Sequence, residues 1–364
     1  MQIHATNVTW TFAKSENRNC NFSTFEPSPF GSCYFYEIMS EIKNIGVLTS
    51  GGDSPGMNAC IRAVVRQGLH HNVQVSGIYR GYDGLIEGEL KIFGSHDVSN
   101  IIQRGGTILK SARSAEFYSE KGRKLAYQNL KKENIDALVV IGGDGTFTGA
   151  EIFGNSFNVP VIGIPGTIDN DLYGTDFTIG YDTALNTVID AVDKIRDTAN
   201  SHDRLFIVEV MGKDAGFIAL RSGIAVGAEA ILIPETKTYI NELIETLESG
   251  WRNNKKSSII LVAEGDDAGG ALEVQKKIQE KFNHYDTRVS ILGHLQRGGS
   301  PSAADRLLAS RLSAEAITAL LQGRKGEMVG IVKNEVCFTP FANAIKHHKE
   351  IRKDLLDLAT ILSK

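Results

Sequence analysis

Short apolar segments alternate with amphipathic segments along most of this chain, from Ile45 onward. This alternation is typical of parallel strands joined by crossover helices. The expected strands are residues 45–49, 73–79, 137–141, 159–164, 205–210, 231–233, 258–263 and 288–292. The expected helices are residues 57–68, 121–132, 184–198, 239–253, 271–282 and 303–321. The sequence therefore predicts an α/β fold with mainly parallel sheets covered by helices.

The length and charge of the chain limit its organisation further. A chain of 364 residues is longer than one hydrophobic core usually supports, so we expect two lobes. A net charge of −4 disfavours a broad nucleic-acid-binding surface, and no apolar run reaches the roughly 18–20 residues that span a bilayer. We therefore expect no nucleic-acid partner and no membrane partner. The cysteines lack metal-ligand spacing, which favours a reduced, cytoplasmic protein; they are Cys20, Cys33, Cys60 and Cys337.

Residues 1–41 differ from the rest of the chain. They are rich in Asn, Ser, Thr and aromatic residues and show neither a sustained period nor a secretion signal. Met39 stands just before the first expected strand. We interpret residues 1–41 as an extension that is disordered, or that results from a start site assigned too far upstream. A mass measurement of the native N-terminus would distinguish the two.

The loop 165–171, PGTIDND, follows the expected strand 159–164 and carries two acids. Open α/β sheets bind ligands at the carboxyl ends of their strands, so these acids are expected at a binding edge. A hydroxyl that attacks a phosphoryl group needs a carboxylate to accept its proton, and Asp169 is the candidate base. Asp171 either restrains Asp169 or accepts a hydrogen bond from a metal-bound water. The alternative is a loop in which the acids only form an Asx-turn network.

The loop 142–146, GGDGT, follows the expected strand 137–141 in the same way, with a helix expected to begin near Thr146. Gly145 leaves room for a phosphate, the N–H groups of the turn can bind it, and Asp144 can hold Mg²⁺. The same motif occurs in NAD kinases and lipid kinases. It therefore indicates nucleotide phosphate binding without defining the acceptor.

Two further glycine-rich loops carry candidate ligand groups. The loop 49–57, TSGGDSPGM, offers the N–H groups of a following helix to an anion. It lacks both the G-x-G-x-x-G spacing and the P-loop lysine, so a tight turn without a ligand explains it equally well. The segment 291–301, ILGHLQRGGSP, ends a strand with His294 and Arg297. This pair suits a phosphate monoester, because the arginine can bind it as a bidentate fork and the histidine can donate a second hydrogen bond.

Taken together, these motifs resemble those of bacterial-type 6-phosphofructokinases from about Ile45 to near the C-terminus. The strings that carry the resemblance are LTSGGDSPGMNA (48–59), RGGT (104–107), SARS (111–114), IGGDGT (141–146), PGTIDND (165–171), TIGYDTALNT (178–187), VEVMGKDAG (208–216) and LGHLQRGGSP (292–301). Their order and spacing follow the family pattern.

The resemblance implies the phosphofructokinase fold, with two doubly wound, Rossmann-like lobes. Residues 42–180 plus 297–345 would form the ATP-binding lobe, and 181–296 plus 346–364 the lobe that binds fructose 6-phosphate. The implied activity is that of an ATP-dependent 6-phosphofructokinase of glycolysis, which transfers the γ-phosphoryl group of ATP to the 1-hydroxyl of fructose 6-phosphate with Mg²⁺. The implied assembly is a cytoplasmic homotetramer whose active sites are shared between subunits.

The resemblance also assigns roles to individual residues. Asp169 would be the base, with Thr167, Asp171, Arg113 and Gly52 as further catalytic residues. ATP would contact Gly52, Arg113, Ser114, Arg123, Gly143, Asp144, Gly145 and Thr146, with Mg²⁺ on Asp144. The sugar phosphate would contact Thr167, Asp169, Met211, Gly212, Lys213, Glu264, His294 and Arg297, and also Arg204 and Arg288 from a neighbouring subunit. Lys213 departs from the family pattern, which often has Arg there.

Two glycines distinguish ATP from pyrophosphate as the donor. Pyrophosphate-dependent relatives carry an Asp at the position of Gly145 and a Lys at the position of Gly166, and these side chains would fill the space of the α-phosphate of ATP. The sequence therefore favours ATP. The alternatives are a pyrophosphate-dependent enzyme and a catalytically inactive regulatory paralogue that binds sugar phosphate.

A regulatory site is only partly preserved. Relatives bind ADP or phosphoenolpyruvate between subunits, and five matching residues are present: Arg62, Arg66, Arg196, Glu229 and Lys255. Three positions depart from the pattern, with Ser95, Asn253 and Ser257 in place of an Arg, a Lys and a His. Because charge-assisted hydrogen bonds are the stronger ones, losing these groups is expected to weaken effector binding and allostery.

Overall fold

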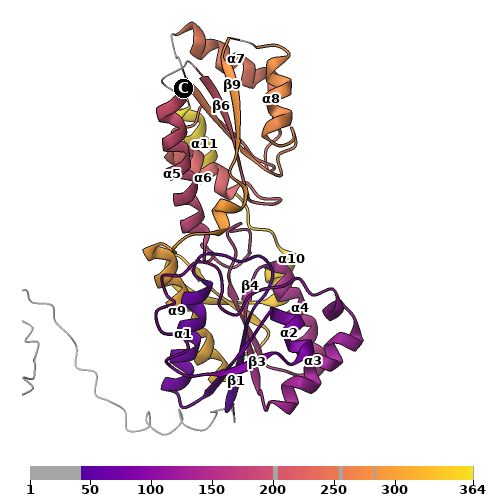
Figure 1. The fold of residues 1–364 in the computed structure, drawn as a ribbon. Coiled ribbons are helices and arrows are strands. Elements are labelled where there is room, and N and C mark those ends of the chain that lie inside the picture. Colours follow the sequence, from indigo (N-terminus) through magenta and orange to yellow (C-terminus); the bar gives the residue numbers. More distant parts are fainter. Residues whose placement is uncertain (1–41, 200–203, 254–256, 283, 364) are drawn as a thin grey trace, which may run out of the picture. The chain divides into compact units, whose positions relative to one another are not determined.

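Two β-sheets form the framework of the described chain (Figure 1). The computed structural model describes residues 42–199, 204–253, 257–282 and 284–363. The predicted extension, residues 1–41, lies outside the described residues. Among the described helices, none is long and apolar enough to cross a membrane.

The first sheet has seven strands in the order β11-β10-β5-β4-β1-β2-β3. Its central strands pair in parallel, whereas β3 and β11 pair antiparallel at the two edges. The strands are β1 (Asn44–Thr49), β2 (Gln74–Ile78), β3 (Leu90–Phe93), β4 (Ala137–Gly142), β5 (Val161–Pro165), β10 (Glu327–Val332) and β11 (Glu335–Pro340). The strand order reverses between β1 and β4, and ligands of doubly wound sheets bind at such a switch point.

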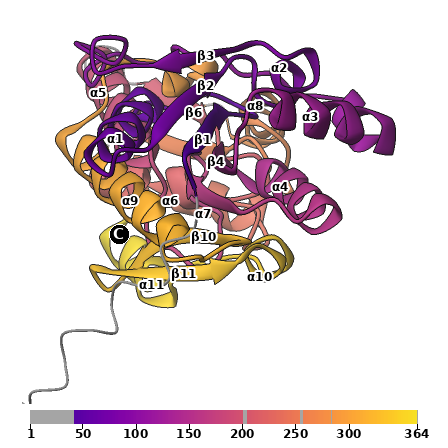
Figure 2. The same cartoon turned by 90° about the horizontal axis from the view of Figure 1, so that it is seen from below.

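Helices bury both faces of this sheet, so its central strands read as continuous apolar runs. Successive residues of β1 point to opposite cores: Val47 packs beneath α1 and α9, and Leu48 packs beneath α2, α3, α4 and α10. Figure 2 shows α1 and α9 on one side of the sheet and α3 and α4 on the other. These helices are α1 (Met57–His70), α2 (Gly81–Glu87), α3 (Glu120–Lys132), α4 (Asp144–Phe157), α9 (Ala303–Leu321) and α10 (Phe341–Lys346).

The second sheet has four parallel strands in the order β7-β8-β6-β9. One core lies beneath α5 and α6, with residues next to and within α11 packed against it, and the other beneath α7 and α8. The strands are β6 (Arg204–Val210), β7 (Ala230–Leu232), β8 (Ser258–Ala263) and β9 (Asp286–Ile291). The helices are α5 (Tyr181–Ala199), α6 (Phe217–Ala225), α7 (Ile240–Arg252), α8 (Ala271–Gln279) and α11 (Lys353–Leu362).

The structure confirms the predicted α/β class with mainly parallel sheets. Every strand and helix expected from the periodicity is present within a few residues, and α4 begins at Asp144 rather than near Thr146. The periodicity did not indicate β3, β10, β11, α2, α6, α10 or α11. The strands of the first sheet lie within residues 44–165 and 327–340, and those of the second within 204–291. The exact boundaries of the two lobes stay a prediction.

Candidate active site

The loop after β5 holds Asp169 in a buried position. The residue is 9% exposed, and its Oδ1 has no hydrogen-bond partner among the described residues. The backbone N–H of Asp169 donates to Thr167 Oγ1 at 3.2 Å, so this hydroxyl supports the loop from within. A buried carboxylate oxygen without a partner is costly for folding, which points to a group kept for a ligand.

Asn170, between the two acids, closes the turn. It adopts a left-handed φ of 55°. Its Oδ1 accepts from Thr178 N–H at 2.9 Å, and Thr178 Oγ1 donates to Thr167 O at 2.6 Å. The amide therefore takes the role that the Asx-turn interpretation gave to Asp169, whose Oδ1 stays available, while the Asp171 carboxylate also accepts from its own backbone N–H.

The environment raises the pKa of both acids. Burial raises the pKa of Asp169, while the nearby charge of Arg297 and the hydroxyl of Thr167 oppose the rise. Burial also raises the pKa of Asp171 to about 6, and the negative charges of Asp169 and Asp144 add to the effect. Two like charges in one site make proton binding more favourable, which is a property of a general base.

The amino terminus of α4 presents Asp144 and an open space beside it. The Asp144 carboxylate is exposed and lies 3.6 Å from Lys213 Nζ, which belongs to the loop after β6. A Cβ built on Gly145 would meet no atom within 4 Å. Thr146 Oγ1 donates to Ser50 O at 3.1 Å and so joins the helix to the loop after β1. Free N–H groups at a helix start with room beside them form an anion site.

The loop after β1 contacts Arg297. The Arg297 Nη1 donates to Asp53 O at 3.1 Å. A Cβ on Gly52 would lie 2.3 Å from the same Nη1, so only glycine lets the guanidinium approach this closely. The loop therefore holds a cation whose charge reaches Asp169, and its own contact with a ligand stays a prediction.

The second sheet contributes its own strand ends. Glu264, just after β8, accepts from Lys213 N–H at 2.8 Å and from Gly212 N–H at 3.3 Å. Gln296 Oε1 accepts from Met211 N–H at 3.2 Å. His294 stands exposed on the short 3₁₀ helix Gly293–Arg297. The charges of Lys213 and Glu264 act on Asp169, so the carboxyl ends of both sheets meet at this site.

The loop before α3 carries the predicted ATP residues Arg113 and Ser114, and the first turn of α3 carries Arg123. Ser114 Oγ accepts from Phe117 N–H at 3.2 Å. Arg123 Nη1 donates to Phe117 O at 3.0 Å and to Tyr118 O at 2.7 Å, so this guanidinium holds the turn η1 (Glu116–Tyr118). Arg113 is exposed on the same loop. Arg123 thus supports the loop that presents Arg113, and its predicted contact with ATP stays a prediction.

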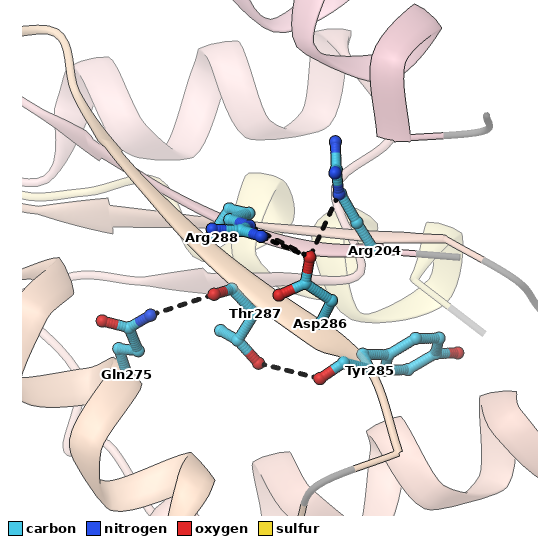
Figure 3. Close-up of polar contacts among 6 residues, drawn as sticks. All are labelled: Arg204, Gln275, Tyr285, Asp286, Thr287 and Arg288. Atoms are coloured by element: carbon cyan, nitrogen blue, oxygen red, sulfur yellow. Dashed lines mark hydrogen bonds and ion pairs between the residues drawn. The ribbon is translucent and has the colours of Figure 1, made fainter. Parts of the chain in front are cut away.

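Arg204 and Arg288 lie away from this chain's own site. Both pair with Asp286, at 3.2 Å and 2.7 Å, at the amino ends of β6 and β9 (Figure 3). The site lies beyond the carboxyl end of β6, and at about 3.3 Å per residue the strand places Arg204 roughly 20 Å from Val210. Arg204 is therefore too far from Asp169 of the same chain to contact it, whereas Arg288 is the third residue of β9 and is held by Asp286. The contact of both arginines with the site of a neighbouring copy stays a prediction.

The predicted effector residues fall on separate elements. Arg62 and Arg66 lie on α1, which packs on the first sheet. Arg196 Nη2 donates to the carbonyl oxygens of Val226 and Gly227, and Glu229 accepts from Ile259 N–H, both in the second sheet's layer. Lys255 lies outside the described residues. A shared effector site stays a prediction.

Sequence reasoning missed several residues that shape the site. Asn170 and Gln296 sit inside motifs that were recognised, so the amide between two acids and the amide beside Arg297 were available signals. Asp305 accepts from Gly180 N–H at 2.9 Å and Thr183 N–H at 2.8 Å and so joins α9 to α5. Lys349, near the C-terminus, donates to Asp176 O just after the catalytic loop. No local pattern marks either of these two.

Comparison with known proteins gives a consistent result. A sequence model of the family described as Phosphofructokinase matches residues 44–320. ATP-dependent 6-phosphofructokinase 2 of Bacteroides thetaiotaomicron is 59% identical over 325 residues, which cover 89% of this chain and 100% of that protein. ATP-dependent 6-phosphofructokinase 1 of Thermus thermophilus is 55% identical over 322 residues, 88% of this chain and 100% of that protein.

Solved structures agree with these relatives. Phosphofructokinase from Saccharomyces cerevisiae superposes with a TM-score of 0.80 at 38% identity, over 88% of this chain and 46% of that chain. A pyrophosphate-dependent phosphofructokinase from Marinobacter aquaeolei superposes with a TM-score of 0.76 at 21% identity, over 88% of this chain and 91% of that chain. The latter likeness shows the fold alone.

Proposed function

This chain belongs to the phosphofructokinase family, and we propose that it transfers the γ-phosphoryl group of ATP to the 1-hydroxyl of fructose 6-phosphate. The relatives at 55–59% identity cited above are named as ATP-dependent 6-phosphofructokinases. The observation that carries the assignment concerns Asp169 Oδ1: it is buried and has no hydrogen-bond partner in the described part of the chain, at the strand edge where α4 also begins. The enzyme acts in glycolysis.

The structure of the donor loop supports ATP over pyrophosphate. The position of Gly145 is open, so a carboxylate there would project into the space beside the helix amino terminus. A Cβ on Gly166 would lie 2.9 Å from Ile141 Cγ2 and 3.3 Å from Met57 Cε. A lysine could be accommodated there only if these side chains shifted. Gly145 thus leaves room for a nucleotide phosphate chain, and the packing around Gly166 disfavours the lysine of pyrophosphate-dependent relatives.

Asp169 is the proposed general base. Its Oδ1 accepts the proton of the sugar hydroxyl as the hydroxyl oxygen bonds to the γ-phosphorus and the bond from that phosphorus to the β-phosphate oxygen breaks, which releases ADP. Burial raises the pKa of Asp169, so the proton is held better than on an exposed acid. A positioned base of this kind contributes about 10²–10⁴-fold to the rate.

Cations and backbone dipoles around the base would stabilise the transferring phosphoryl group. Arg297 and Lys213 bring positive charge to Asp169, and the open position Gly145 lies in the first turn of α4, where the helix N–H groups are unpaired by a side-chain cap. Phosphoryl transfer depends mainly on positioning and on neutralising negative charge that spreads over the phosphate oxygens. Arg113, exposed on its loop, is a further proposed contact to the phosphates.

Asp144 fits the proposed Mg²⁺. Among the described residues, no group of three or more His, Cys, Asp or Glu side chains could hold a metal without help. Mg²⁺ in nucleotide sites is usually held by one or two carboxylates together with the substrate phosphates, so a single exposed acid at a helix amino terminus suffices. When bound, Mg²⁺ supplies charge neutralisation of the phosphate chain.

The sugar phosphate is proposed to bind between the two sheets and a neighbouring copy. Glu264 and Gln296 hold the Met211–Lys213 loop at this region, and His294 is a further proposed contact, exposed on the neighbouring 3₁₀ helix. Arg204 and Arg288 would come from the adjacent subunit: Arg204 stands at the amino end of β6, opposite the site, and Arg288 pairs with Asp286 beside it. We therefore propose that active sites are shared between subunits. The proposed assembly is a homotetramer, and the proposed location is the cytoplasm.

The experiment that tests this function compares phosphoryl donors. Purified protein is given fructose 6-phosphate, Mg²⁺ and either ATP or pyrophosphate, and fructose 1,6-bisphosphate is measured in a coupled assay. Turnover with ATP and none with pyrophosphate is expected, and Asp169→Asn serves as the inactive control. Turnover with pyrophosphate alone would assign the protein to the pyrophosphate-dependent class. A folded protein without turnover on either donor would favour an inactive regulatory paralogue.

A further inference from the structure

Lys349 lies beside the catalytic loop although it is remote from it in sequence. It belongs to the segment between α10 and α11, and its neighbour His348 forms an antiparallel bridge with Leu172. Leu172 directly follows Asp171. The segment that carries Lys349 therefore runs along the exit of the loop that holds both acids.

The ammonium of Lys349 makes two contacts there. Its Nζ donates to Asp176 O at 2.6 Å, and the same carbonyl oxygen accepts from Asn170 Nδ2 at 3.3 Å. Nζ also lies 5.3 Å from the ring centroid of Phe217, the first residue of α6. One cation thus connects the amide that closes the catalytic turn with a helix of the second sheet, through a charge-assisted hydrogen bond and a cation–π contact.

Charged groups surround this cation from each neighbouring element. The carboxylates of Asp176 and Asp171 favour its protonated form, and the guanidinium of Arg221 on α6 disfavours it. Burial is the largest influence and lowers the pKa of Lys349 to about 8. At neutral pH the side chain is therefore mostly charged, and it loses its proton only a little above that range.

We propose that the Lys349 ammonium is a positioning group for the catalytic loop, acting through Asp176 O and Asn170 to hold Asp169 where it can accept the hydroxyl proton. The proposal rests on the proposed function, since it concerns the geometry of that reaction. Neutral Lys349 keeps N–H groups but loses the cation–π contact, the charge assistance of the hydrogen bond and the attraction to Asp171 and Asp176. The loop is then held less firmly and kcat falls.

The test is a pH profile of kcat from about pH 6.5 to 9.5, with ATP and fructose 6-phosphate saturating, for the intact protein and for Lys349→Arg and Lys349→Met. The wild type should lose activity as pH rises through about 8. Lys349→Arg keeps its charge, because the guanidinium pKa exceeds ~12, so its alkaline decline should move to higher pH. Lys349→Met should have a kcat roughly tenfold to a hundredfold lower at neutral pH and a flatter profile.

Two controls separate an effect of Lys349 on the catalytic loop from a general loss of protein stability. Lys346→Met removes an exposed lysine of α10 and should leave both kcat and the profile unchanged. A melting temperature for each variant, measured at the assay pH, shows whether the fold persists. If Lys349→Arg does not fold, the flattened profile of Lys349→Met tests the same point, since a purely structural role would lower kcat equally at every pH.

Three results would overturn the proposal. They are a near-normal kcat of Lys349→Met at neutral pH, an unchanged alkaline decline in Lys349→Arg, and a decline in Lys349→Met that parallels the wild type. None of these would affect the proposed function, which fails only if the wild type does not phosphorylate fructose 6-phosphate with ATP.

Discussion

Replacing Asp171 with Asn should stabilise the unliganded protein at neutral pH while it lowers activity. Burial, together with the charges of Asp169 and Asp144, raises the pKa of Asp171 from its ordinary 3.8 to about 6. At ~1.36 kcal/mol per pKa unit, this rise means that the ionised carboxylate destabilises the folded state by about 3 kcal/mol. An amide of the same shape carries no charge at any pH, so Asp171→Asn removes this penalty.

The sign of the effect follows from proton binding. The folded-state pKa lies above the unfolded value, so the folded protein binds more protons between about pH 4 and pH 6, and its stability falls as pH rises through this window. Above about pH 6 the full penalty applies. The advantage of Asp171→Asn is therefore largest at neutral pH and disappears towards pH 4.

Thermal unfolding without ligands measures this directly. For a chain of this size, a stabilisation of about 3 kcal/mol corresponds to an increase of about 4 °C in Tm. Melting curves of the wild type and Asp171→Asn are recorded from about pH 5 to pH 8, with kcat measured in parallel. Asp193→Asn, an exposed acid on α5, is the matched control and should shift stability by less than about 0.5 kcal/mol. A Tm of Asp171→Asn at or below that of the wild type at neutral pH, or a difference independent of pH, would refute the reasoning.

Three further outcomes follow from the site and its supports. Asp169→Asn should lower kcat by about 10²–10⁴-fold with little change in KM for fructose 6-phosphate, and a near-normal kcat would remove Asp169 from the role of base. Mixing Asp169→Asn with Arg204→Ala should restore activity in hybrid oligomers, whereas verified hybrids without activity would contradict a shared site. Asp305→Ala leaves the buried N–H groups of Gly180 and Thr183 without their acceptor, so the free energy of unfolding should fall by about 2–6 kcal/mol in denaturant titrations. A loss below about 1 kcal/mol would show that these groups find other partners.

The sequence by itself determined the local features of this protein. The apolar runs of β1, β4 and β5 predict buried parallel strands, because both faces of such a sheet are covered. The carboxyl ends of parallel strands meet at one edge, so the glycines and acids that follow these runs had to share a site. Asp144 and Asp169 could be selected for this reason. The edge strands escaped detection, since β3 is largely exposed and β11 is only partly buried.

Only the tertiary structure decided which side chains, distant in sequence, lie at the site and which lie away from it. The sequence around Arg204 gives no sign of its distance from Asp169, which follows only from the course of β6: the strand starts at Arg204, beside Asp286 of β9, and runs towards the site. Lys349 reaches the catalytic loop because the C-terminal segment pairs with Leu172, and Asp305 joins α9 to α5 across more than a hundred residues. Such contacts depend on how helices and sheets pack together, and packing is set by the shape of the whole core rather than by any local period.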